Sequence, residues 1–107
     1  MKNNKILGLI GLSARARKVS FGADSTEEDI KKRKAKLVIV AEDGSERTKN
    51  KYIDLCQKYN IPILIFSNIE NISKAIGKEN KAIIGIKEVN IAKQIQKNPR
   101  HPKDVGE

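Results

Sequence analysis

The stretch that most constrains the fold runs from Ala35 to Ser45, with the sequence AKLVIVAEDGS. Its centre, Leu37 to Val40, holds four apolar residues, three of them β-branched, in a run too short for a helix. Such a run is typical of a central strand that is buried on both faces. Acids and turn formers follow at once, and in an open α/β sheet ligands bind at this end of the strands. We therefore expect the functional site near the end of this strand.

The rest of the chain alternates between helical and strand patterns. Apolar residues at helical spacing predict helices over residues 3–14, 25–33, 45–58, 69–76 and 88–97. Short apolar runs predict further strands over residues 19–21, 63–66 and 82–86. This alternation favours a small α/β/α sandwich. We predict a single domain over residues 1–97, followed by a flexible C-terminal tail over residues 98–107, which is polar and rich in proline.

Local signals place three features within these helices. Ser25 and Glu28 have the spacing of a capping box, which predicts that the second helix has its N-cap at Asp24 or Ser25. The third helix is expected to bury Tyr52 and Cys56. The last helix is expected to turn its inner face to the core, with the residues Val89, Ala92 and Ile95 or Gln96.

The balance of charge points to a polyanionic partner. The chain has 22 Lys and Arg against 13 Asp and Glu, a formal net charge of +9. Such a charge favours nucleic acid or an anionic membrane surface, and the alternative is a well-solvated surface rich in lysine. The apolar run from Ile6 to Leu12 is far shorter than the ~20 residues of a membrane span. We expect a soluble protein whose partner is nucleic acid.

Residues that could support catalysis are few. Cys56 is the single cysteine, so neither a disulfide nor a zinc site is expected, and the chain is predicted to be cytoplasmic. His101, the single histidine, lies between prolines in the tail. Glu42 and Asp43 fit a turn and a helix cap better than a catalytic pair. We expect no enzyme, no cofactor, no metal and no small-molecule substrate.

The aromatic residues do not suggest a base-stacking surface. There are two Tyr and two Phe, and most of them fit the core pattern. RNA binders that read bases on a sheet face need exposed aromatic side chains. The remaining mode is recognition by shape, with helix N-termini, loop amides and basic side chains against phosphates and base edges.

Four segments stand out together: the AKLVIVAEDGS block, Phe21 to Asp24 ahead of it, the Asn60–Pro62 turn, and Ile72 to Gly77 before an apolar strand. In their order and spacing they resemble the kink-turn RNA-binding ribosomal protein family, and in particular its small bacterial YlxQ-like members. The resemblance covers roughly residues 4–97 and implies a three-layer α/β/α sandwich with a small mixed four-stranded sheet. It also implies an RNA site at the glycine-led start of the second helix, with a second contact from the loop before the last strand.

The residues at this implied site depart from the family pattern of Gly, any residue, Asn, Glu, two more residues and Lys. Gly22 agrees with the pattern, whereas Asp24, Ser25 and Glu28 replace its Asn, Glu and Lys. An ionised Asp24 accepts hydrogen bonds but cannot donate them. In the later loop, residues 78–81, Lys78 and Lys81 stand where the family places apolar residues, and these lysines would contact phosphates instead.

We therefore predict a non-enzymatic protein that recognises a structured RNA, kink-turn-like, ribosomal or messenger, either on the ribosome or free. A monomer is expected. Gly22 would contribute amide contacts, Asp24 or Ser25 base-edge contacts, and the cations phosphate contacts. The candidate RNA-binding residues are Lys18, Gly22, Asp24, Ser25, Lys31, Arg47, Lys78 and Lys81. Arg15 and Arg17 would extend this surface.

Two alternatives belong to other functional classes. Glu28 could mark a protein-interaction module that keeps the fold but has lost RNA recognition. A metabolic enzyme that uses Glu42 and Asp43 is the third hypothesis.

Overall fold

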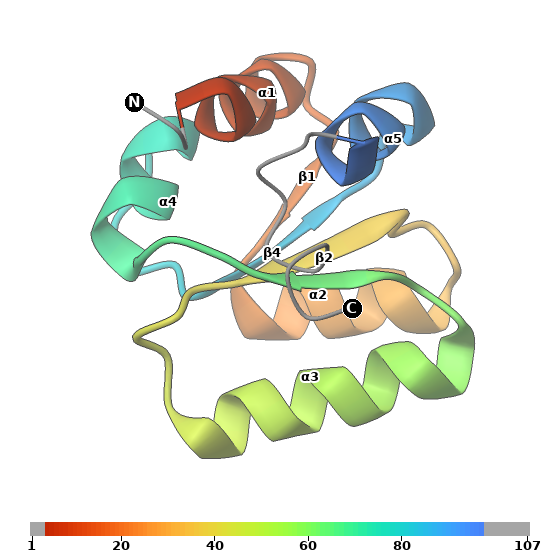
Figure 1. The fold of residues 1–107 in the computed structure, drawn as a ribbon. Helices are drawn as coiled ribbons and strands as arrows, with labels where there is room; N and C mark the ends of the chain where they lie inside the picture. Colours follow the sequence, from red (N-terminus) through yellow and green to blue (C-terminus); the bar gives the residue numbers. More distant parts are fainter. Residues whose placement is uncertain (1–3, 98–107) are drawn as a thin grey trace.

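The computed structural model describes residues 4–97, which form a three-layer α/β/α sandwich (Figure 1). This arrangement confirms the predicted fold class. The elements in chain order are α1 (Asn4–Arg15), β1 (Val19–Phe21), α2 (Gly22–Lys31), β2 (Leu37–Val40), α3 (Glu46–Tyr59), β3 (Ile63–Ile65), α4 (Ile69–Ile76), β4 (Ile83–Ile86) and α5 (Val89–Lys97). The predicted tail over residues 98–107, with His101, lies outside the described residues. The division into a domain and a tail stays a prediction.

The sheet is mixed and has the strand order β1-β4-β2-β3. Strand β4 runs antiparallel to both of its neighbours, whereas β2 and β3 are parallel, so that β1, β2 and β3 all run in one direction. We call the side where these three strands end and β4 begins the carboxyl edge, and the opposite side the amino edge. This topology decides which loops meet, because segments far apart in the chain reach the same edge.

The central strand β2 separates two apolar cores. Helices α1, α4 and α5 cover one face of the sheet, and α2 and α3 cover the other (Figure 1). Leu37 and Ile39 belong to the first core, Val38 and Val40 belong to the second, and all four side chains are fully buried. The expectation that this strand is buried on both faces is confirmed.

Most helix ends follow the chemistry of their terminal residues. Ser45 caps α3, since its hydroxyl oxygen accepts a hydrogen bond from the Thr48 amide at 3.1 Å. Asn60 ends α3 in the left-handed conformation, and Gly77 ends α4 in the same way with φ +72°. These stops confirm the predicted breaks after the two helices.

The capping-box prediction for α2 is wrong. The helix begins at Gly22, directly after β1, so Phe21 occupies the N-cap position and Ser25 and Glu28 lie inside the helix. A φ of +87° at Gly22 turns the chain from strand to helix without a loop. A residue with a β-carbon would adopt this conformation only with strain.

The prediction for the inner face of α5 is wrong at its first residue. Val89 is 44% exposed, and the buried residues are Ile91, Ala92 and Ile95. The Glu88 carboxylate accepts from the Ile91 amide at 2.7 Å and caps the helix. Val89 precedes Ile91 by two positions, which turns it to the opposite side of a 3.6-residue helix.

Cys56 is a buried core thiol on α3, as the sequence predicts, and it gives a probe of unfolding. Its side chain is 1% exposed, and burial raises the pKa of the thiol to about 11. Because the thiolate is the reactive form, a thiol reagent at about pH 8 should modify the native protein only as fast as it opens. Labelling kinetics in buffer and in denaturant check this expectation. Modification of the native protein as fast as a free thiol would contradict the packing described here.

Candidate nucleic-acid interface

The carboxyl edge brings the start of α2 next to the loop that precedes β4. Strand β1 pairs with β4, with Phe21 opposite Ile84, so the end of β1 lies beside the beginning of β4. Residues 77–82, which we call the late loop, lead into β4 and therefore reach the junction between β1 and α2. The sequence resemblance implies this pair of segments, and the sheet topology places them side by side.

Two lysines of the late loop converge on the junction. A β-carbon built on Gly22 would lie 3.6 Å from the Lys81 Nζ, so the lysine side chain passes directly over the glycine. The Lys78 Nζ lies 4.9 Å from the centroid of the Phe21 ring, a cation–π contact. We call Phe21, Gly22, Lys78 and Lys81 the junction site. It combines two cations with a helix-starting residue, Gly22, that carries no side chain of its own.

The late loop is anchored at both of its ends. The buried Ser73 hydroxyl accepts a hydrogen bond from the Lys81 amide at 2.8 Å, and the Ser73 carbonyl accepts from the Lys78 amide at 2.9 Å. Asn80 adopts φ +56°, which bends the loop between these bonds. Ser73 was missed from the sequence, where its only signal is a small polar residue on the apolar face of α4. It holds both lysines in place.

The first turn of α2 offers backbone donors to a ligand. Phe21 has no side-chain oxygen with which to cap the helix, so the first amides are left for solvent or an anion. Asp24 and Ser25 are exposed in this turn. The Tyr52 hydroxyl donates to the Ala23 carbonyl at 2.9 Å and ties α3 to the turn. Burial raises the pKa of Tyr52 to about 12, so this donor stays protonated at neutral pH.

Lys31 lies away from the junction site, near the other end of α2, and it is already paired. Its Nζ is 3.0 Å from the Glu27 carboxylate, which Lys51 also approaches at 3.1 Å. The hydrogen bond with Lys31 and then that with Lys51 lower the pKa of Glu27, and the bond with Glu27 raises the pKa of Lys31. An RNA phosphate that contacts this lysine would therefore meet a charge that Glu27 already partly neutralises.

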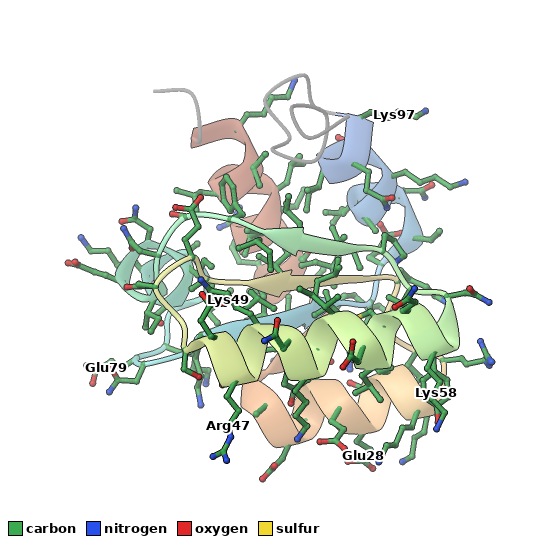
Figure 2. All side chains as sticks on the ribbon, turned by 60° about the horizontal axis from the view of Figure 1, so that its bottom comes forward. Glu28, Arg47, Lys49, Lys58, Glu79 and Lys97 are labelled. Carbon is green, nitrogen blue, oxygen red and sulfur yellow. The ribbon has the colours of Figure 1, made fainter. Side chains whose placement is uncertain are left out.

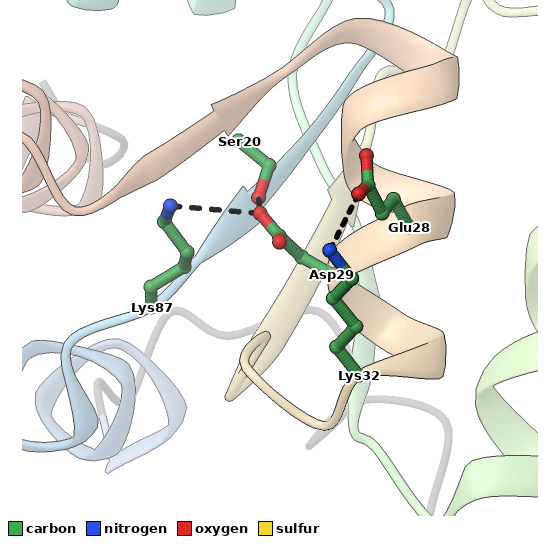
Figure 3. A network of polar contacts seen from close by, with 5 residues as sticks. All are labelled: Ser20, Glu28, Asp29, Lys32 and Lys87. Atoms are coloured by element: carbon green, nitrogen blue, oxygen red, sulfur yellow. Dashed lines mark hydrogen bonds and ion pairs between the residues drawn. The ribbon is translucent and has the colours of Figure 1, made fainter.

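Glu28 and Asp29 leave α2 in different directions (Figure 3). Glu28 is exposed and pairs with Lys32 at 2.7 Å, and this bond raises the pKa of Lys32. Asp29 points to the sheet, where the Ser20 hydroxyl donates to its carboxylate and the Lys87 Nζ lies 3.5 Å away. The position at which the family pattern has lysine therefore presents a negative charge to solvent.

Arg47 and the acids before it lie at the carboxyl edge. Arg47 is exposed in the first turn of α3, and Figure 2 shows it on the same side of the molecule as Glu79 of the late loop. The Asp43 carboxylate accepts from the Ile69 amide at 2.8 Å, so Asp43 supplements the Asn68 N-cap of α4 and does not cap the helix that follows it in sequence. This bond supports the turn-and-cap interpretation of Asp43 over a catalytic pair with Glu42.

Lys18 lies at the other end of β1 from the junction site. It precedes β1, and its carbonyl accepts from the Lys87 amide at 2.8 Å at the amino edge. Four residue steps of extended chain put it about 13 Å from Gly22. The structure thus brings Gly22, Lys78 and Lys81 together, leaves Asp24, Ser25 and Arg47 around the same edge, and separates Lys18 and Lys31 from them.

Lys18 belongs instead to a second group of cations. An open hollow of about 410 Å³ at the amino edge is lined by basic residues alone, namely Arg17, Lys18, Arg33, Lys34, Lys36 and Lys87. We call it the basic hollow. The basic run after α2 is contiguous in the sequence, whereas Lys87 joins it only through the antiparallel pairing of Leu37 with Ile86.

Residues 4–97 contain neither a metal-binding cluster nor a membrane-spanning helix. No group of three or more His, Cys, Asp or Glu side chains in that range is arranged to hold a metal ion. None of the helices in the described part of the chain combines the length and the apolar character that a membrane crossing requires.

Comparisons with known proteins identify relatives over nearly the whole described chain. The profile of the ribosomal protein L7Ae/L30e/S12e/Gadd45 family matches residues 4–96. A protein of Bacillus subtilis (strain 168) named RNA-binding protein YlxQ is 33% identical over 87 residues, which cover 81% of this chain and 87% of the relative. A protein of the same name from Enterococcus faecium is 43% identical over 91 residues, which cover 84% and 86% of the two chains.

Solved structures show the same fold. A protein of unknown function from Bacillus halodurans C superposes with a TM-score of 0.81 at 33% identity, over 84% of this chain and 91% of the other. The 15.5kD RNA binding protein of Giardia lamblia superposes with a TM-score of 0.76 at 17% identity, over 87% and 82%. At that lower identity the likeness concerns the fold alone.

Proposed function

The chain belongs to the ribosomal protein L7Ae/L30e/S12e/Gadd45 family, and on that premise we propose that it is a non-enzymatic RNA-binding protein that recognises a structured RNA at the junction site. Relatives that are 33% and 43% identical carry the name RNA-binding protein YlxQ, which supports RNA as the partner. The formal charge of +9 agrees with a polyanionic ligand.

One observation carries the choice of site. Lys78 and Lys81 come from a loop far along the chain, yet both reach the strand–helix junction at Phe21 and Gly22. Cations and free helix amides together suit a phosphate. Gly22 lets a sugar–phosphate backbone approach closely, because it carries no side chain. In this proposal the two lysines and the first-turn amides hold phosphates, while Asp24 and Ser25 accept from base edges.

The target in this proposal is a bent RNA element, kink-turn-like or ribosomal, bound by a monomer in the cytoplasm, either on the ribosome or free. A bend would bring phosphates of two RNA segments close together, so that the late loop and the start of α2 could contact both at one small site. Asp24 favours base donors, such as exocyclic amines, where an asparagine would both donate and accept.

The protein-interaction alternative is not favoured, because the curated relatives over most of the chain carry the name of RNA-binding proteins. The enzyme alternative also loses support, since the Asp43 carboxylate is engaged by the Ile69 amide.

A binding titration tests the proposed function. A kink-turn RNA and a matched straight duplex are titrated at about 50 mM and about 200 mM salt. We expect the kink-turn RNA to bind more tightly than the duplex at both salt concentrations, because in the proposed mode a bend brings phosphates of two RNA segments to the junction site. Equal binding to the two RNAs, with the same steep salt dependence, would mean that net charge alone is responsible and would contradict the proposal.

A further inference from the structure

We propose that the basic hollow at the amino edge is a second RNA-backbone site, which holds phosphates of a helical arm that flanks the element bound at the junction site. This inference rests on the proposed function for the identity of the RNA. It concerns a different edge of the sheet and different residues.

The charge of the hollow is concentrated and largely uncompensated. Its six cations come from three segments, because the chain after α1, the chain after α2 and the end of β4 all reach the amino edge. Within residues 4–97, the only ion pair of any of them with a carboxylate is that of Lys87 with Asp29, at 3.5 Å. Five cations are thus left to attract an anion.

Two of these cations stand where helix termination favours another residue. Arg17 and Arg33, each the second residue after α1 or α2, adopt φ +61° and +59°. The amides of the residues that follow, Lys18 and Lys34, donate to the carbonyls five residues before them at 2.9 and 2.8 Å. This is the Schellman arrangement, in which glycine is the usual left-handed residue because a β-carbon costs about 1–2 kcal/mol there.

The same Arg-Lys pair therefore closes two helices at one edge, and all four residues line the hollow. Basic residues near a helix C-terminus also complement the helix dipole, but that effect does not require arginine at the left-handed position. An anionic ligand in the hollow accounts for arginine at the left-handed position after both helices.

One arginine is already held in position. The Arg33 guanidinium donates to the Tyr59 carbonyl at 3.2 Å and lies 5.4 Å from the centroid of the Tyr59 ring. These contacts reduce the entropy that the side chain would lose on binding. The lining has no aromatic residue, so the hollow suits phosphates rather than stacked bases, and the contact would position RNA without reading its sequence.

The two sites are close enough for one RNA. Lys18 and Gly22 stand at opposite ends of β1, about 13 Å apart, on a molecule whose extents are 32 × 32 × 26 Å. A helical arm that leaves the junction site along the β1 side passes the hollow. An RNA with a short arm would contact the junction site but not the hollow.

The test compares arm length across two charge-matched variants of the full chain. Lys34→Glu with Lys36→Glu alters the hollow, and Lys93→Glu with Lys97→Glu makes the same charge change on α5, outside it. The RNAs are kink-turn elements with a short arm or with an arm of about 16 base pairs, the length that duplex-binding domains cover. The Lys34 and Lys36 amides, which bond to Asp29 and Ile86, are unchanged by the substitutions.

We expect the long arm to strengthen binding by wild-type protein and by the α5 variant on the order of 10-fold. The hollow variant should lose this gain, and its salt slope on the long-arm RNA should be shallower by about 2. Thermal unfolding checks that each variant is folded. If the charge reversal unfolds the chain, the neutral variant Lys34→Gln with Lys36→Gln takes its place, and we expect it to lose part of the long-arm gain.

Two other outcomes overturn the inference: a long-arm gain that survives in the hollow variant, or no gain in the wild-type protein. A different result is expected if the proposed function itself is wrong. In that case kink-turn RNA would show no advantage over a straight duplex, whereas a long duplex would still bind in a manner that depends on Lys34 and Lys36.

Discussion

The double substitution Lys78→Glu and Lys81→Glu is expected to lower the affinity for kink-turn RNA on the order of 100-fold at low salt, because two phosphate contacts become repulsions. The Lys78 Nζ packs over the Phe21 ring, and the Lys81 side chain passes over Gly22, so both charges lie at the junction site. The salt slope should become shallower by about 2. Titrations over a range of salt concentrations measure both effects.

The control for this prediction is Lys93→Glu with Lys97→Glu, which changes the net charge equally on α5. We expect a much smaller loss for this variant, because neither lysine lies at the junction site or in the hollow. Equal losses for the two variants would show that the global charge, rather than the late loop, determines affinity. The anchoring bond of the Lys81 amide to Ser73 involves the backbone and survives the substitution.

Substitution of Gly22 by alanine is expected to lower both stability and RNA affinity. The residue has φ +87°, so a β-carbon costs about 1–2 kcal/mol of folding free energy. The new methyl group would also lie 3.6 Å from the Lys81 Nζ, within the space over which RNA must approach. We expect an affinity loss on the order of 10-fold, beyond what the unfolded fraction explains. Denaturant unfolding and RNA titration measure the two quantities separately.

Gly8→Ala is the matched control for Gly22→Ala. Gly8 is exposed in the middle of α1, and a β-carbon there has no heavy atom within 4 Å. Alanine should therefore stabilise the chain by about 0.5–1 kcal/mol through helix propensity and leave RNA binding unchanged. If the Gly22→Ala protein binds RNA as tightly as wild type does, Gly22 is not part of the RNA-binding site.

The elements were predictable from the sequence because their signals are local. The apolar run from Leu37 to Val40 is decisive for a strand buried on both faces, and Asn60 and Gly77 end their helices with their own backbone conformations. The start of α2 was mispredicted because Ser25 and Glu28 have capping-box spacing, whereas the glycine φ that starts the helix earlier leaves no comparable pattern in the sequence.

The composition of the site was less predictable, because it depends on pairing between distant strands. The meeting of Lys78 and Lys81 with Gly22 follows from the antiparallel pairing of β1 with β4, which no local pattern specifies. Lys18 is near Gly22 in sequence, yet an extended strand carries it to the other edge. The ion pair of Lys31 with Glu27, by contrast, could have been anticipated from their i,i+4 spacing.

The most direct test of the central claim, that the junction site binds RNA, is a map of backbone amide shifts as kink-turn RNA is added to isotope-labelled protein. We expect the largest changes at Gly22, Asp24 and Ser25 of α2 and across residues 77–82, because these amides line the strand–helix junction. Smaller changes at Lys18 and Lys34 should appear only with a long-arm RNA. Changes confined to α5 or to the outer face of α3, with the junction amides unmoved, would contradict the claim.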